Sequence, residues 1–129
     1  METYLISNDY NGPVILIFGD TLNGIPNNNV YDFTKSNILR IQKNISDDNF
    51  INLDNINFFG IDNNNKFKIP IILNEGEILG DTTKYVFLYN SQIGDRNHKK
   101  SYQSIIISDK AHYSNSVHLE NHLLDSLSR

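Results

Sequence analysis

The chain contains no cysteine and no long hydrophobic run, and these absences exclude several classes of protein. Without cysteine, its 129 residues hold no disulfide framework, no thiolate zinc site and no cysteine nucleophile. No apolar run approaches the roughly 20 residues that a membrane-spanning helix needs. The opening residues 1–7 lack the pattern of a secretory signal peptide. We therefore expect a cytoplasmic protein whose folding is independent of its oxidation state.

Motifs for phosphate binding and for serine hydrolysis are also missing. The glycine-containing segment Gly19–Pro26 is not followed by the Gly-Lys-Ser/Thr of a phosphate-binding loop. No serine has the sequence context of a nucleophile elbow. Repeats and linkers are likewise absent, so the length predicts a single domain over residues 1–129 with one core.

Positive charge is scarce in the first half of the chain. Residues 1–62 hold three Lys/Arg against eight Asp/Glu, whereas residues 63–129 hold eight against seven, and the net charge is −4. An acidic first half repels phosphate backbones, so any nucleic-acid contact is expected in the second half. Asparagine is abundant, which we interpret as genomic base-composition bias. An origin in a phage or mobile element is a hypothesis from that composition alone.

The apolar pattern predicts an α+β fold: an antiparallel sheet with one or two helices packed on it, and an N-terminal β-hairpin region. Asn and Asp in Asp62–Asn65 accept the left-handed backbone that hairpin turns need. Pro70 cannot donate to a ladder, so its strand is expected at an edge or at a bulge. The expected hairpins join residues 3–6 to 14–18, 30–33 to 38–42, and 56–61 to 66–73.

Two later segments have clear patterns. Ile105–Ile107 between serines predicts a buried strand, and residues 81–89 are interpreted as a helix in preference to a strand. The last helix is predicted over residues 114–127, because leucines recur there at helical spacing and must face a core. The leucines and valine of that face are Val117, Leu119, Leu123, Leu124 and Leu127.

Glu120 is the one charge placed beside this apolar face. It precedes Leu123 and Leu124 by three and four residues, so its carboxylate lies at the edge of the buried stripe. One interpretation is a rim glutamate whose stem covers the core while its head reaches water. The other is a carboxylate aimed into a cleft, where it binds a divalent ion. His118 and His122 share a helix face as a surface pair or as metal ligands, and Glu120 points elsewhere.

Arg96, Lys99 and Lys100 form the one basic cluster, beside Tyr102. Such a cluster is commonly a solvated loop. The alternative is a contact with phosphate or with an acidic partner, to which Lys110 would add a fourth charge.

The order of these segments resembles the GIY-YIG nuclease superfamily, in the bacterial branch with an N-terminal β extension. The resemblance implies an extension over residues 1–55 and a nuclease-like core over residues 56–129. It is a likeness of order and pattern over nearly the whole chain, and no individual motif is strong. The segments that carry it are Leu16–Ile25, Val30–Lys43, Phe58–Ile61, Ile71–Ile78, Tyr102–Lys110 and Val117–Leu124.

In that superfamily tyrosines on a hairpin, an arginine and a glutamate surround one divalent ion, which stabilises the leaving oxygen while the arginine stabilises phosphoryl charge. The resemblance places Glu120 at the glutamate position. Phe58 and Ile71, which have no hydroxyl, occupy the tyrosine positions. Residues 78–89 contain no arginine, and Lys84 is their only cation. Losing each such stabiliser costs on the order of 100-fold in rate.

The resemblance therefore implies a catalytically degenerate domain that acts as an interaction module and requires no cofactor. A protein partner is favoured by the acidic charge, with nucleic acid as the alternative. Two rival hypotheses remain. One is a slow Mg²⁺-dependent DNA endonuclease that uses Glu120 with Tyr85 or Tyr89. The other is a small-molecule-binding protein, unrelated to nucleases, with its pocket between sheet and helix.

Overall fold

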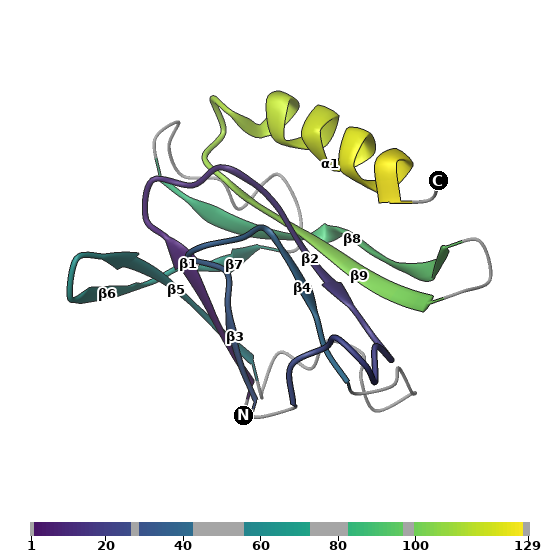
Figure 1. The fold of residues 1–129 in the computed structure, drawn as a ribbon. Coiled ribbons are helices and arrows are strands. Elements are labelled where there is room, and N and C mark those ends of the chain that lie inside the picture. Colours follow the sequence, from purple (N-terminus) through teal and green to yellow (C-terminus); the bar gives the residue numbers. More distant parts are fainter. Residues whose placement is uncertain (1, 27–28, 43–55, 73–82, 97–99, 128–129) are drawn as a thin grey trace.

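The computed structural model describes residues 2–26, 29–42, 56–72, 83–96 and 100–127. These residues form two β-sheets and one helix, and the helix covers the outer face of the larger sheet (Figure 1). The four-stranded sheet has the order β3-β1-β5-β6, and the five-stranded sheet has the order β4-β2-β9-β8-β7. The expected α+β class is confirmed. The elements are β1 Glu2–Ser7, β2 Gly12–Ile17, β3 Val30–Asp32, β4 Ile38–Arg40, β5 Ile56–Asp62, β6 Asn65–Lys68, β7 Ile71–Ile72, β8 Tyr85–Arg96, β9 Lys100–Ser108 and α1 Tyr113–Leu127.

The first two strands cross from one sheet to the other, so the first predicted hairpin is wrong. β1 pairs in parallel with β5, whereas β2 pairs antiparallel with β9. The Asn-Gly-Pro turn signals a chain reversal, but a reversal leaves open whether two strands pair edge to edge or pack face to face. All six residues of β2 are buried, so its burial on both faces favours the face-to-face arrangement.

β3 and β4 repeat this crossing, and the second predicted hairpin is wrong for the same reason. β3 lies parallel to β1, and β4 lies parallel to β2. The Phe33 amide donates to the Leu5 carbonyl at 2.7 Å, and Ser7 Oγ donates to the Thr34 carbonyl at 3.1 Å. Each sheet therefore contains strands from both sides of residue 55. The boundary between residues 1–55 and 56–129 that the resemblance implies does not separate one sheet from the other.

The third predicted hairpin is confirmed in its first half. β5 and β6 pair antiparallel around Asn63, whose φ of 55° is the left-handed conformation that asparagine tolerates. The chain then leaves this sheet at Pro70, which has no N–H to donate to a ladder. Ile71–Ile72 form β7 at the edge of the five-stranded sheet.

Aromatic rings fill the space between the two sheets. Tyr4 of β1 stacks on Phe58 of β5, with ring centroids 4.5 Å apart, and on Phe33 at 6.0 Å. The side-chain amide of Gln103 donates through Nε2 to the Tyr4 hydroxyl at 3.0 Å, so these two buried polar groups are paired. Buried isoleucine, leucine and valine side chains of β2, β8 and β9 complete this core.

A second apolar layer lies between the five-stranded sheet and α1. Phe87 of β8 packs on Tyr113 of α1, with ring centroids 4.5 Å apart, and Ile106 and Val117 belong to the same layer. The helix is the only one in the described residues, and it is too short and too polar to span a membrane.

The interpretation of residues 81–89 as a helix is wrong over its described part, where β8 begins at Tyr85, and residues 81–82 lie outside the described residues. Val86 faces the core between the sheets and Phe87 faces α1, so successive side chains of β8 are buried on opposite faces. That alternation is what a strand between two apolar layers produces. The buried strand over Ile105–Ile107 is confirmed, since all three side chains are fully buried.

Candidate functional site

Glu120 lies under α1 against β9, so the prediction of a rim position is wrong. Its exposed fraction is 2%, and Ser104 Oγ donates to Glu120 Oε2 at 2.7 Å. Ser116, one turn earlier, is the other buried residue of the helix. The two fully buried residues of the helix are therefore polar, whereas its apolar residues Tyr113 and Val117 pack partly buried against the sheet. The leucines expected at this contact are only half-buried, on the flanks.

Phe58 and Ile71 are not brought together near Glu120. Phe58 is fully buried between the two sheets, so the five-stranded sheet separates it from Glu120. Ile71 lies on β7, in the other sheet from Phe58. The expectation of one β-ribbon facing Glu120 is wrong, because the chain changes sheets at Pro70.

The four basic residues singled out from the sequence do not form one patch. Arg96 and Lys100 pair across the end of the β8–β9 hairpin, while Lys99 lies outside the described residues. Lys110 is exposed and follows the opposite end of β9. Nine residues of strand place the two ends roughly 27 Å apart. A small ligand could therefore not contact both Lys100 and Lys110.

His118 and His122 are both exposed on α1, while Glu120 faces the sheet. The prediction that Glu120 points away from the two histidines is confirmed. Within the described part of the chain, no group of three His, Cys, Asp or Glu side chains is placed to hold a metal ion.

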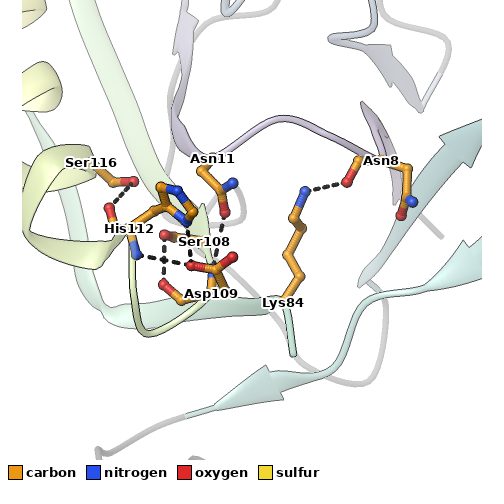
Figure 2. Close-up of polar contacts among 7 residues, drawn as sticks. All are labelled: Asn8, Asn11, Lys84, Ser108, Asp109, His112 and Ser116. Atoms are coloured by element: carbon orange, nitrogen blue, oxygen red, sulfur yellow. Dashed lines mark hydrogen bonds and ion pairs between the residues drawn. The ribbon is translucent and has the colours of Figure 1, made fainter. Parts of the chain in front are cut away.

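A polar network joins the start of α1 to the turn between β1 and β2 (Figure 2). Asp109 Oδ1 accepts from the His112 amide at 2.8 Å and lies 2.7 Å from His112 Nδ1. The Asp109 amide donates to Asn11 Oδ1 at 3.0 Å. The hydroxyls of Ser108 and Ser116 donate to backbone carbonyls, at 2.8 and 2.9 Å. An Asp-His pair is present, but in these contacts neither serine hydroxyl is hydrogen-bonded to the imidazole.

Lys84 lies beside this network and donates to the Asn8 carbonyl (Figure 2). Burial lowers the pKa of the Lys84 ammonium, and the carboxylates of Asp109 and Asp9 oppose that shift. Perturbed lysines occur at functional sites and in structural networks alike. Because this one ties the first turn of the chain to β8, we assign it a structural role.

β6 is exposed along its whole length and lies at the edge of the four-stranded sheet. Phe67 at its centre is 50% exposed, between the exposed Lys66 and Lys68. Lys66 Nζ lies 5.4 Å from the centroid of the Phe59 ring on β5, within reach of a cation–π contact. No motif in the sequence predicts this surface. Its one signal was Pro70, which predicted an edge strand nearby.

A shallow hollow of about 360 Å³ lies between the turn after β1 and the turn after β3. Tyr10 OH donates to the Pro13 carbonyl at 2.6 Å and accepts from Asn37 Nδ2 at 3.4 Å, so both side chains are held in place. Hydroxyl, amide and ammonium groups line the hollow, with Lys35 as its cation.

Comparisons with known proteins bear on the fold alone. No protein-family model and no curated protein matches the sequence. Among solved structures, the chain is similar to the crystal structure of a Bacillus anthracis protein described as "Putative Lipoprotein", with a TM-score of 0.50 and 10% sequence identity. The match covers 89% of this chain and 77% of that chain. At this identity the likeness shows a shared fold and carries no activity from one protein to the other.

Proposed function

We propose that the protein is a non-catalytic interaction module that binds a protein partner through the β5–β6 hairpin, residues 56–68. The observation that carries the proposal is the exposed edge strand β6. Phe67 is the only aromatic among the large apolar side chains exposed in the described residues. Partly exposed aromatic side chains are frequent anchors of protein contacts.

The charge of the chain favours a protein over a nucleic acid as this partner. The net charge of −4 repels a phosphate backbone. Arg96 and Lys100 lie together at the end of the β8–β9 hairpin, and they would be the nucleic-acid contact in the alternative hypothesis. Lys110 follows the opposite end of β9 and is too far away to extend that pair.

The positions of the titratable residues support a role without catalysis. Glu120 is part of the contact between α1 and β9, where it accepts a hydrogen bond from Ser104. Tyr85, which the endonuclease hypothesis pairs with Glu120, lies opposite Ser108. Ser108 is four residues along β9 from Ser104, or about 13 Å. This separation of the two positions along β9 does not favour an ion shared by Tyr85 and Glu120.

Site-specific photocrosslinking tests the proposal. The photoreactive residue replaces Phe67 in one variant and Leu22 in the other. Leu22 is the matched control, because it is 90% exposed but lies in the loop after β2, beside the other sheet. In cells of the native host we expect a discrete protein adduct from position 67 and none of the same size from position 22. Identical adducts from both positions, or none from position 67, would contradict the proposal.

A second candidate function is the binding of a small polar molecule in the hollow beside Lys35. This location differs from the one expected from the sequence, which lies between sheet and helix, where Phe87 and Tyr113 pack against each other. Native mass spectrometry of protein purified from the host would detect a bound small molecule. Its loss in Lys35→Ala, with retention in Lys110→Ala, would support this candidate.

A further inference from the structure

We infer that the partner of the β5–β6 hairpin is an acidic segment in extended conformation, which adds to the four-stranded sheet as a fifth strand beside β6. This inference rests on the proposed function and names the chemistry of the partner. It follows from three features of β6: its backbone groups, its charge, and its length.

The backbone of β6 has hydrogen-bonding groups directed away from the sheet. The Ile69 amide donates to the Phe58 carbonyl at 2.8 Å, which makes these two residues a hydrogen-bonded pair. Antiparallel pairs alternate, so Phe67 is hydrogen-bonded to its partner on β5, whereas Lys66 and Lys68 are not. The amides and carbonyls of both lysines therefore point toward the open edge. In the described residues no strand lies beyond that edge.

The side chains beside this edge carry positive charge on one face. Lys66 and Lys68 are two residues apart and lie on the same face, opposite Ile61 and Phe59 of β5. The residues of β5 on that face are uncharged, so neither lysine has a carboxylate across the strand pair. An added strand with acidic residues at alternate positions would place a carboxylate next to each ammonium.

The same lysines disfavour the other occupants of the edge. A second copy of β6 pairing with the first would set Lys66 and Lys68 against identical charges, which is a common device against edge-to-edge association. A nucleic acid would meet two lysines here on a protein of net charge −4. An acidic peptide is attracted by the lysines, and its backbone can pair with the edge.

The length of β6 limits the contact to a short segment. The strand has four residues, and the chain turns away at Pro70. Two outward-facing residues offer two amides and two carbonyls, so about four hydrogen bonds can form. We therefore expect a weak contact, with a dissociation constant on the order of 10–1,000 μM.

A synthetic peptide titration tests the inference. The probe is acetyl-Ser-Glu-Val-Glu-Ser-amide with a fluorophore, which places two glutamates on one face and valine on the other. The full-length protein is compared with the double variant Lys66→Glu/Lys68→Glu. The matched control is Lys35→Glu/Lys110→Glu, which makes the same change in net charge at two exposed lysines elsewhere. We expect about 10-fold weaker binding for the first pair and less than about 2-fold for the second.

A second peptide tests strand addition separately from charge. It carries N-methyl groups on the amides that face β6, and it keeps both glutamates. We expect this peptide to bind about 10-fold more weakly, because the edge hydrogen bonds are lost. Equal binding of the methylated and unmethylated peptides, equal effects of the two double variants, or no binding at about 1 mM peptide would each overturn the inference.

The peptide titration and the crosslinking test different claims, so a negative result in one does not imply a negative result in the other. An adduct at position 67 together with no peptide binding would refute the acidic-strand partner and leave the proposed function standing. Absence of an adduct at position 67 would remove the proposed function itself. A concentration-dependent dimer of the protein that is abolished by Lys66→Glu/Lys68→Glu would assign the edge to a second copy and overturn the inference.

Discussion

At the scale of single residues, the contact between α1 and β9 contains a buried carboxylate that is paired with a hydroxyl, because Ser104 Oγ donates to Glu120 Oε2 at 2.7 Å. The sequence predicts Glu120 as a charge beside an apolar stripe, but one of its hydrogen-bond donors, Ser104, is 16 residues away. Helical spacing predicts which face of a helix a side chain lies on. It does not predict which residue of a distant strand will contact that side chain. The half-exposed Phe67 was missed for a related reason: an alternating Lys-Phe-Lys run does not say how deep a strand lies in its sheet.

Removing the hydroxyl of Ser104 is expected to destabilise the protein. Ser104→Ala takes a donor from a buried carboxylate, which typically costs about 1–3 kcal/mol. The double variant Ser104→Ala/Glu120→Leu removes both polar groups and should be more stable than Ser104→Ala alone. Urea denaturation measures both. A double variant less stable than the single one would show that Glu120 has a further stabilising role.

A methyl group at Gly24 should be poorly tolerated. A Cβ there would lie 2.4 Å from the Asp20 carbonyl oxygen and 2.6 Å from the Ile41 carbonyl carbon, both backbone atoms. We expect Gly24→Ala to lose about 1–3 kcal/mol of unfolding free energy. Gly60→Ala is the control, because its nearest neighbour is the Asn8 side-chain oxygen at 2.9 Å, which can move away. Equal losses in urea denaturation would contradict this account.

Tyr4 should couple stability to alkaline pH. Burial raises the pKa of the Tyr4 phenol, so above about pH 10 the unfolded state has lost the proton that the folded state retains. The unfolded state then binds fewer protons, and stability falls as pH rises through this range. Tyr4→Phe should reduce that fall, although it costs about 1–3 kcal/mol at neutral pH by leaving the Gln103 amide without its acceptor. Denaturation of both proteins at about pH 7 and about pH 10.5 measures the difference.

At the scale of elements, the sequence predicted those with strong local signals. The turn at Asn63, the strand at Ile105–Ile107 and the final helix need only short-range chemistry, and they formed as expected. The first two hairpins did not form, because pairing edge to edge and packing face to face use the same turn residues. Arg96 and Lys100 were expected in a loop and instead end a strand pair.

The contact between the turn after β1 and the turn after β3 leads to a prediction at the scale of elements. Ser7 Oγ donates to the Thr34 carbonyl and thereby links the turn after β1 to the turn after β3. Ser7→Ala should destabilise the protein by about 0.5–1.5 kcal/mol, the usual net value of one such bond. The loss should appear as faster amide exchange at the turn after β3. Unchanged exchange there would mean that the two turns are stabilised independently.

At the scale of the whole molecule, the two sheets are covered differently. The helix covers the five-stranded sheet, whereas the described residues place no helix on the outer face of the four-stranded sheet (Figure 1). In the four-stranded sheet, β6 is the exposed edge strand and carries cationic side chains. The candidate site could not be predicted from the sequence, because strand order depends on contacts between segments far apart in the chain.

The measurement that tests the central claim most directly is amide hydrogen exchange at Lys66, Phe67 and Lys68 in the free protein. An open edge predicts fast exchange at both lysines and slow exchange at Phe67, whose amide bonds to β5. Addition of the acidic peptide should then slow exchange at the two lysines only. Slow exchange at all three amides in the free protein would contradict the account, because it would mean that the edge of β6 is already covered.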